Sequence, residues 1–307
     1  GALAIPSIYE GKPVTSIGGS AFYNCSRITS ARIPESVTSI GGSAFSGCSS
    51  LTSVTIPDSV TSIGDRAFRY CSSLTSVTIG NSVTSIEGWT FDYCGNLTSV
   101  MIGDSVTSIG KKAFAHCSGL TSVRIPESVT SIGDLAFYDS VSLTSVTIPD
   151  SVISIGSRAF EYCGFTSVII GMSVTSIGWN AFVYCNSLES ITFRGNAPTR
   201  HTFSGVSDFA KIFINPGATG FGETFGGLPV LILKKLKINT FSKSDSPFTI
   251  SFESKAGATY VIEVTHDLKQ WSEIAEVQGT GSSVKFADPR LPVVPFKRNY
   301  FRFKLVE

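Results

Sequence analysis

Apolar residues return at the same positions every 23 residues along most of the chain. The segment from Val37 to Ser59 reads VTSIGGSAFSGCSSLTSVTIPDS, and the segment from Val60 to Ser82 reads VTSIGDRAFRYCSSLTSVTIGNS. The eight repeats begin at a valine, and the last step is 22 residues instead of 23: Val14, Val37, Val60, Val83, Val106, Val129, Val152 and Val174. A fixed period of this length is typical of a solenoid, in which each coil covers the apolar side of its neighbour.

Within one coil the pattern predicts a strand, turns and a short connecting segment. The stretch Leu74 to Ile79 ends in the alternation of a β-strand. Gly64 follows the V-T-S-I run and predicts a turn with an unusual φ, and Pro57 to Ser59 has the composition of a turn. The A-F-x-x-C segment is too short for a full helix, so we expect a single helical turn there. With coils about 4.8 Å apart, identical apolar positions become continuous buried ladders.

The pattern degrades after Phe193, and the composition changes again from about Lys234. Residues 194–233 keep fragments of the repeat and are rich in aromatic residues, which predicts a terminal cap over the last coil. Beyond them, short alternating stretches such as Tyr260 to Val264 and Glu273 to Val277 are separated by turn residues. This spacing predicts a small antiparallel β-sandwich. We therefore expect a mostly β chain with a solenoid at residues 1–233 and a sandwich at residues 234–307.

The pattern A-F-x-x-C-x-x-L-T-S-V-x-I-P-x-S-V-T-S-I-G resembles the leucine-rich repeats of BspA-like bacterial surface proteins, also called the treponemal type. The resemblance covers about residues 1–230 and includes Leu3 to Val14, which is similar to the end of a preceding, degenerate repeat. It implies a secreted or surface-attached protein that binds host proteins, matrix or other cells. The region after residue 234 loosely resembles the C-terminal β-domains of secreted bacterial proteins and a fibronectin type III module.

Charge and hydropathy exclude several functions. Charged residues make up 15% of the chain and the formal net charge is +1, so no electrostatic footprint for nucleic acid or a membrane surface stands out. The apolar run Leu228 to Leu233 is far below the roughly 20 residues that span a bilayer. The chain begins at Gly1, so we expect a fragment from which any signal sequence has been removed. We also expect a monomer.

Two columns of side chains are candidates for chemistry. Seven cysteines continue one column, with Ser140 in the remaining place: Cys25, Cys48, Cys71, Cys94, Cys117, Cys163 and Cys185. Stacked side chains point the same way, and no C-x-x-C pair is present, so we expect packed free thiols rather than disulfides or a metal site. A carboxylate column could bind calcium loosely or supply a catalytic pair, but turn residues that bond to main-chain amides are the favoured interpretation: Glu35, Asp58, Asp104, Glu127 and Asp150.

Two variable columns are candidates for binding. The outward strand position forms a hydroxyl-rich face with arginine and methionine, which are favoured at protein interfaces: Arg32, Thr55, Thr78, Met101, Arg124, Thr147 and Ile169. The position before the cysteine varies between coils and is tyrosine in four of them, with Trp89 and Trp179 nearby, and these tyrosines could bind sugars or protein: Tyr70, Tyr93, Tyr162 and Tyr184. Either column could instead be solvent-tolerated surface without a ligand.

The residues therefore favour a non-catalytic protein with no cofactor and no metal. The histidines His116, His201 and His266 fall in three unrelated contexts, and no catalytic motif includes them. The leading hypothesis is a secreted or cell-surface adhesion protein that binds an extracellular protein. The alternative is a carbohydrate-binding accessory module of a larger secreted protein. An enzyme in its own right is the third and weakest interpretation.

Overall fold

The computed structural model describes residues 1–199, 203, 205–233, 238–241, 249–254, 256–257, 259–265, 272–287 and 300–306. The chain divides into two compact units, Gly1–Leu233 and Lys234–Glu307. His201, His266 and Lys234 lie outside the described residues. The described part contains strands and turns and no helix.

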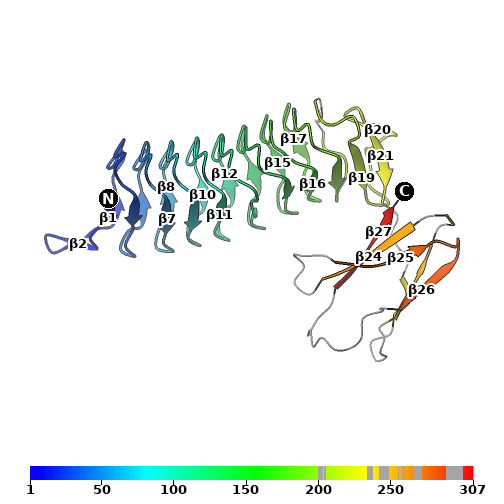
Figure 1. Cartoon of the computed structure of the whole chain (residues 1–307). Coiled ribbons are helices and arrows are strands. Elements are labelled where there is room, and N and C mark those ends of the chain that lie inside the picture. Colours follow the sequence, from blue (N-terminus) through cyan, green and yellow to red (C-terminus); the bar gives the residue numbers. More distant parts are fainter. Residues whose placement is uncertain are drawn as a thin grey trace. The chain divides into compact units, whose positions relative to one another are not determined.

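The first unit is a solenoid of about eight coils (Figure 1). Its main sheet is parallel and built from the S-V-x-I segment of successive coils, with valine and isoleucine buried and the residue between them facing outward. The first half runs in the order β1 (Ala2–Ala4), β5 (Ser30–Arg32), β7 (Ser53–Ile56), β9 (Ser76–Ile79) and β11 (Ser99–Met101). The second half begins β14 (Ser145–Thr147), β16 (Ser167–Ile170), β18 (Ser190–Phe193), β19 (Lys211–Ile214).

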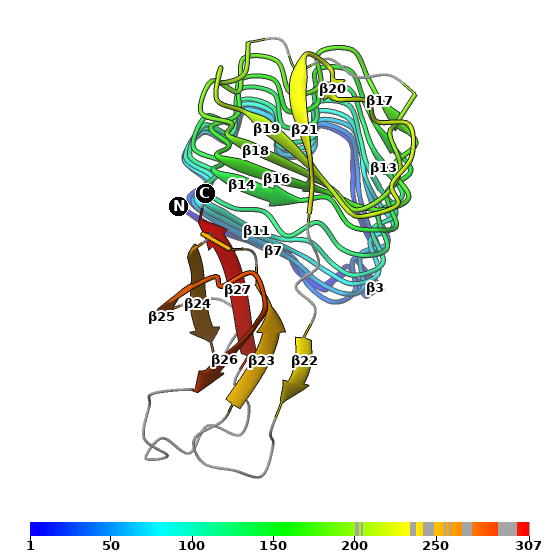
Figure 2. The ribbon, with the colours of Figure 1, turned by 90° about the vertical axis from the view of Figure 1, so that its right-hand side faces the viewer.

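A second set of short parallel strands forms another side of each coil, directly before the position, Gly64 in the third coil, at which the sequence predicts a turn. Within two separate sheets, one of three strands and one of five, the Ser-Ile pair of one coil pairs with the Ser-Ile pair of the next. These strands are β4 (Ser16–Ile17), β6 (Ser39–Ile40) and β8 (Ser62–Ile63), then β10 (Ser85–Ile86), β12 (Ser108–Ile109), β13 (Ser131–Ile132), β15 (Ser154–Ile155) and β17 (Ser176–Ile177). Viewed along the solenoid, the two sets lie on different sides of the superposed coils (Figure 2).

The core of the solenoid is a set of ladders. Seven phenylalanines, one per coil, are buried and stack face to face with ring centroids 5.2 to 5.5 Å apart: Phe45, Phe68, Phe91, Phe114, Phe137, Phe160 and Phe182. Leucine, valine and isoleucine ladders flank them, including Leu74, Val77 and Ile79. Each coil thus buries its apolar side against two neighbours, as the repeat predicts.

The A-F-x-x-C segment is not the helical turn that its sequence predicts. In the third coil, Arg66 and Tyr70 have φ values of 59°, in the left-handed region. The amide of Phe68 between them donates to the carbonyl of Thr90 in the next coil, at 2.9 Å. Alternate amides therefore bond to the neighbouring coil rather than along the segment, and the same arrangement recurs through the repeats. A continuous helix would have used these amides for hydrogen bonds within the segment. Their bonds to the next coil therefore prevent the helical turn that the sequence favours.

The prediction of an unusual φ at Gly64 is also wrong. Gly64 is not among the residues with positive φ. A Cβ atom placed on it would lie 2.5 Å from the amide nitrogen of Gly42 in the preceding coil. Glycine is required there because two main chains approach each other closely.

The two ends of the solenoid differ. At the N-terminal end, a small hairpin of β2 (Ile8–Tyr9) and β3 (Lys12–Pro13) precedes the first coil. At the other end, β21 (Leu228–Ile232) pairs parallel with β19 and antiparallel with β20 (Thr224–Phe225). Four phenylalanines gather beneath this last coil: Phe193, Phe203, Phe221 and Phe225. This aromatic cluster closes the apolar core at the position where the sequence predicts a cap.

The second unit contains two three-stranded antiparallel sheets. One has the order β22 (Ile238–Phe241), β23 (Thr249–Glu253) and β26 (Ser283–Ala287). The other has the order β25 (Ser272–Gln278), β24 (Thr259–Thr265) and β27 (Tyr300–Val306). A small buried cluster of Ile250, Phe252, Tyr260, Ile262 and Phe286 draws residues from both sheets. The sandwich itself stays a prediction.

Candidate functional site: the outer face of the main sheet

The outward strand position forms a continuous column over the first coils. The parallel register pairs Arg32 with Thr55, Thr55 with Thr78, and Thr78 with Met101. Their neighbours in sequence, such as Val54 and Val77, are buried. Because strand side chains alternate between faces, the repeat sequence alone places all four residues on one exposed surface. We call this surface, with Arg124, Thr147 and Ile169 further along, the outer face.

The outer face is interrupted at Arg124. Residues 121–126 form no strand, so the main sheet divides between β11 and β14. The guanidinium of Arg124 instead reaches back to Asp104, with Nη1 2.9 Å from Oδ1, and both side chains are about 70% exposed (68% and 73%). The sequence R-I-P-E-S occurs both at residues 124–128 and at residues 32–36. At the second place its arginine, Arg32, is the last residue of strand β5, so the local sequence does not explain the break. Beyond it, Thr147 pairs with Ile169 and continues the column.

Two shallow grooves lie over the outer face. One, of about 370 Å³, is lined by Thr55, Thr78, Met101 and Arg124, together with main chain at Gly80 and Gly103. The other, of about 570 Å³, is lined by Arg32, Thr55 and the edge strand β1. Gly80 and Gly103 stand where the second coil has Pro57, and a Cβ atom on either would lie within 2.5 Å of a main-chain oxygen of the preceding coil. Met101 is 68% exposed beside the first groove.

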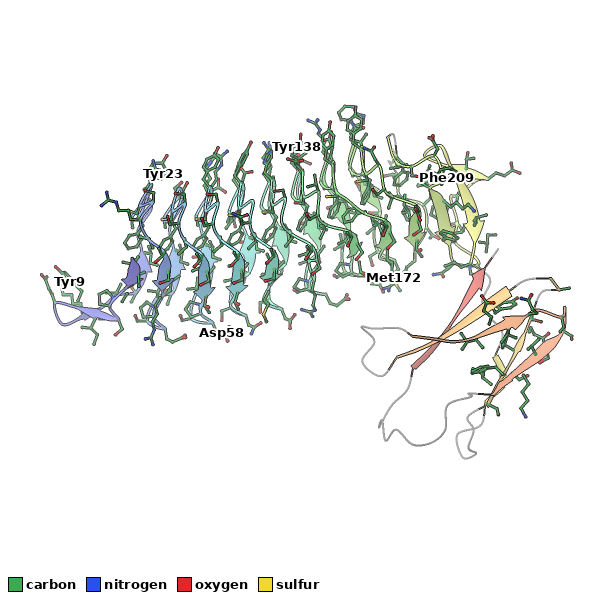
Figure 3. The ribbon with its side chains drawn as sticks, in the orientation of Figure 1. Tyr9, Tyr23, Asp58, Tyr138, Met172 and Phe209 are labelled. Atoms are coloured by element: carbon green, nitrogen blue, oxygen red, sulfur yellow. The ribbon has the colours of Figure 1, made fainter. Side chains whose placement is uncertain are left out.

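The carboxylate column lies at one edge of this face and acts locally. Asp58 Oδ1 accepts from the amide of Asn81 in the next coil, at 2.6 Å, and Asp150 Oδ1 accepts from the amide of Met172, at 2.9 Å. Figure 3 shows Asp58 and Met172 along the same edge of the solenoid. Asp58 and Asp150 thus bond to main-chain amides as the favoured interpretation expects, whereas Asp104 pairs with Arg124 instead. In the described part of the chain, no cluster of three or more metal-binding side chains is found.

The aromatic column lies on the opposite edge, which Figure 3 marks with Tyr23 and Tyr138, each the residue directly before a position of the column. Tyr70 stacks on Tyr93 with ring centroids 5.0 Å apart, and Tyr162 stacks on Tyr184 at 4.8 Å. The four tyrosines are 39 to 46% exposed and have left-handed φ values of 57 to 62°. Such a conformation costs an ordinary residue about 1–2 kcal/mol. Stacking offsets part of this cost, since an aromatic pair contributes about 0.5–1.5 kcal/mol.

The structure also reveals a buried charge network that the sequence did not indicate. Asp92 is fully buried, and its two carboxylate oxygens lie 2.9 Å from Nε of Arg69 and 3.0 Å from Nδ1 of His116. Glu161, at the equivalent position three coils later, is 1% exposed and paired with Arg158. A comparison of equivalent positions could have drawn attention to both acids, since none of the other coils has an acidic residue there: Tyr23, Ser46, Arg69, Ala115, Tyr138 and Val183.

The cysteine column is a ladder of free, hydrogen-bonded thiols. Each thiol from the second coil on donates to the carbonyl of the phenylalanine in the coil before, as Cys71 does to Phe45 at 3.2 Å. Burial raises the pKa of these thiols, to about 11 for Cys48 and about 12 for Cys185. All seven cysteines are free, and the first of them, Cys25, is exposed.

Ser140 explains why one serine is tolerated in the cysteine column. Its hydroxyl donates to the carbonyl of Phe114 at 3.2 Å, the same bond that the thiols make. The column therefore requires a small donor rather than a reactive sulfur. This is a structural role, and it accounts for the column without any ligand or reaction.

Parallel coils, stacked ladders and a turn with glycine on each coil define a leucine-rich repeat solenoid. The family model described as the BspA type leucine rich repeat region matches residues 4–121 and 107–225, with six copies, so the chain belongs to this family. The chain has no match among curated proteins. In the part of the chain that the structure describes, no helix is long and apolar enough to cross a membrane.

Solved structures with similar folds come from several bacteria. A leucine-rich repeat protein from Bacteroides ovatus is 28% identical, with a TM-score of 0.52, over 76% of this chain and 69% of that one. A leucine rich cell surface protein from Faecalibacterium prausnitzii is 28% identical over 75% of this chain and 86% of that one, with a TM-score of 0.39. The leucine rich repeat protein of T. pallidum is 28% identical over 61% and 77%, with a TM-score of 0.45.

Proposed function

We propose that this chain is a non-catalytic, secreted or cell-surface protein that binds an extracellular protein through the outer face of its main sheet. The observation that carries the proposal is that both grooves lie on this face. They are lined by five of the seven candidate residues: Arg32, Thr55, Thr78, Met101 and Arg124. Arginine and methionine are enriched at protein interfaces. Membership of the BspA type family supports a surface location, and one similar solved structure is described as a cell surface protein.

The shape of the outer face favours a protein partner over a small molecule. A small-ligand site buries most of its ligand in a concave pocket, whereas these grooves are open and lined largely by short side chains and main chain. A protruding segment of a partner protein could enter the groove above Gly80 and Gly103. Met101 would supply apolar contact beside it, and Arg124 with Asp104 would supply polar contacts at its rim.

The glycan alternative depends on the aromatic column, and the geometry there does not favour it. Stacking of a sugar on a tyrosine needs an open ring face. Tyr93 has Tyr70 on one face and His116, at 3.9 Å, on the other. The guanidinium of Arg69 lies 4.4 Å from the ring centroid of Tyr70. These faces are occupied within the protein, and ring edges and hydroxyls are what reach solvent.

Catalysis is not part of the proposal because the turn carboxylates are already engaged in contacts within the chain. Asp58 and Asp150 each accept from an amide of the next coil. Asp150 also faces Arg194, and Asp104 pairs with Arg124. The buried pair members Asp92 and Glu161 are already bound to basic side chains. A panel of hydrolase substrates that the chain turned over, with loss on Asp104→Asn, would contradict the non-catalytic assignment.

The binding proposal is tested with an array of purified extracellular proteins probed with the full chain. Hits are repeated with Met101→Asp and Arg124→Glu, which change the outer face. Arg66→Glu is the matched control, because it reverses an exposed arginine on the opposite edge. We expect binding to be lost in the two outer-face variants and kept in the control. Hits that survive both outer-face variants, or binding seen on a glycan array and not on the protein array, would overturn the proposal.

A further inference from the structure

The solenoid has seven cysteines and nevertheless no means of joining its coils covalently through them. Six of the thiols are buried, and each donates to a carbonyl of the preceding coil instead of facing another sulfur. The exposed thiol of Cys25 belongs to the first coil. Side chains that could be cross-linked must be exposed, adjacent and chemically competent, and the aromatic column offers such pairs.

We propose that Tyr70 with Tyr93, and Tyr162 with Tyr184, are sites of oxidative cross-linking that join neighbouring coils through dityrosine. The ring centroids are 5.0 and 4.8 Å apart, with interplanar angles of 28° and 16°. All four side chains are 39 to 46% exposed, so a soluble oxidant can reach them. The repeat holds each pair at adjacent coils, with matching left-handed main-chain conformations, so both phenols stay in register. The proposal is independent of the outer face and its partner.

The reaction requires a one-electron oxidant, here a haem peroxidase using hydrogen peroxide. Each phenol loses one electron and one proton and becomes a tyrosyl radical. The two radicals couple through one Cε atom each, forming a Cε–Cε bond. Both rings then move the hydrogen from the bonded carbon back to oxygen, which restores the two phenols. Two tyrosines and one hydrogen peroxide thus give one dityrosine and two waters.

The geometry also predicts which tyrosines do not couple efficiently. Tyr138 lies 5.8 Å from Tyr162, but its ring stands edge-on at 87°, and the guanidinium of Arg158 lies 5.8 Å from its ring centroid. Tyr23 is 55% exposed, and Tyr9 lies on the hairpin at 65% exposed. These two serve as internal references, because an unselective oxidation would modify them at least as readily as the paired residues.

The test treats the full chain with a haem peroxidase and hydrogen peroxide at low protein concentration, and follows dityrosine fluorescence. Cross-linked peptides, which have lost two hydrogen atoms, are then located by mass spectrometry. Cleavage after Glu87 separates Tyr70 from Tyr93, and cyanogen bromide cleavage after Met172 separates Tyr162 from Tyr184. We expect both cross-links within one molecule, so that the chain still migrates as a monomer on a denaturing gel.

Three substitutions make the result specific. Tyr93→Phe and Tyr184→Phe keep the stacked ring and remove the phenol, and each should abolish one cross-link while leaving the other. Tyr23→Phe should change neither. A chain unfolded in urea should lose the selectivity between pairs. The proposal is overturned if the folded chain gives no dityrosine under conditions that couple free tyrosine. It is equally overturned if the cross-links spread over Tyr9 and Tyr23 or form mainly between molecules.

Discussion

The thiol of Cys94 donates a hydrogen bond to the main-chain carbonyl of Phe68, one coil earlier, at 3.3 Å. Cys117 bonds to the carbonyl of Phe91 in the same way, also at 3.3 Å. The repeat thus connects its coils through side-chain donors as well as through main-chain pairing. Ser140 makes the same bond with a hydroxyl, so serine can replace cysteine in this column without loss of the hydrogen bond.

We expect Cys94→Ser to lower the free energy of unfolding by about 1 kcal/mol or less, since the hydrogen bond is kept. Cys94→Leu should cost about 1–3 kcal/mol, because the fully packed site has no room for the larger side chain. Both values come from urea denaturation of the full chain. Equal costs for the two variants would show that the thiol, and not a small donor, is what the column requires.

The buried thiols also predict a chemical and a pH response. Since the thiolate is the reactive form, native alkylation at pH 8 should modify Cys25 alone, and unfolding should expose all seven. Folding holds the pKa of Cys48 at about 11 instead of 9.0, so the unfolded chain loses this proton first as the pH rises. The contribution of the Cys48 thiol to the free energy of unfolding is therefore fully present below about pH 9 and is lost progressively between pH 9 and 11.

A matched variant isolates this pH effect from other titrating groups. Cys48→Ser removes the thiol and keeps the donor, so its free energy of unfolding should fall less steeply than that of the original chain over the same pH range. Identical slopes in the two proteins would contradict the assignment. Rapid native alkylation of more than one thiol, counted from the mass of the intact chain, would show that the ladder opens in solution.

The phenylalanine ladder should be the most sensitive part of the fold. Phe114 is fully buried, with Phe91 and Phe137 stacked on its two faces at 5.3 Å. Phe114→Ala should cost about 3–5 kcal/mol, because it leaves a cavity inside a continuous stack. Phe22→Ala is the control: Phe22 stacks on Phe45 at 5.0 Å but is only partly buried, so it should cost less. A loss below about 1 kcal/mol at Phe114 would mean that this ladder is not core.

The sequence predicted those parts of the fold that repeat and missed those that depend on contacts between coils. A ladder such as Phe91 on Phe114 follows from the period alone, because identical positions must stack. The left-handed turn at Tyr70 does not, since its cause is the donation of its amide to the carbonyl of Asp92 in the next coil. The strand break near Arg124 also leaves no trace in the local sequence. Strand alternation in the sequence predicted the outer face. It did not predict that the tyrosine rings of the aromatic column stack on one another, because that depends on the left-handed turns.

The buried network at Asp92 should behave as one unit. Arg69→Leu would leave a carboxylate oxygen without its ionic partner in a fully buried site, and should cost about 1–3 kcal/mol or somewhat more because the group is charged. Adding Asp92→Ala should recover part of that loss, because the uncompensated acid is then gone. A double-mutant cycle by denaturation measures the coupling. Strictly additive losses would show that Arg69 and Asp92 do not interact in solution.

The positive φ values predict where glycine stabilises the chain instead of weakening it. Lys112 has a φ of 55°, a conformation that costs a side-chain-bearing residue about 1–2 kcal/mol. Glycine adopts it freely but loses more entropy on folding, so Lys112→Gly should raise the free energy of unfolding by about 0.5–1 kcal/mol net. Its neighbour Lys111 has no positive φ, and Lys111→Gly should lower stability by a similar amount. The two variants have the same composition, so opposite signs in a thermal or urea melt isolate the turn conformation. A loss of stability in both would place the strain elsewhere.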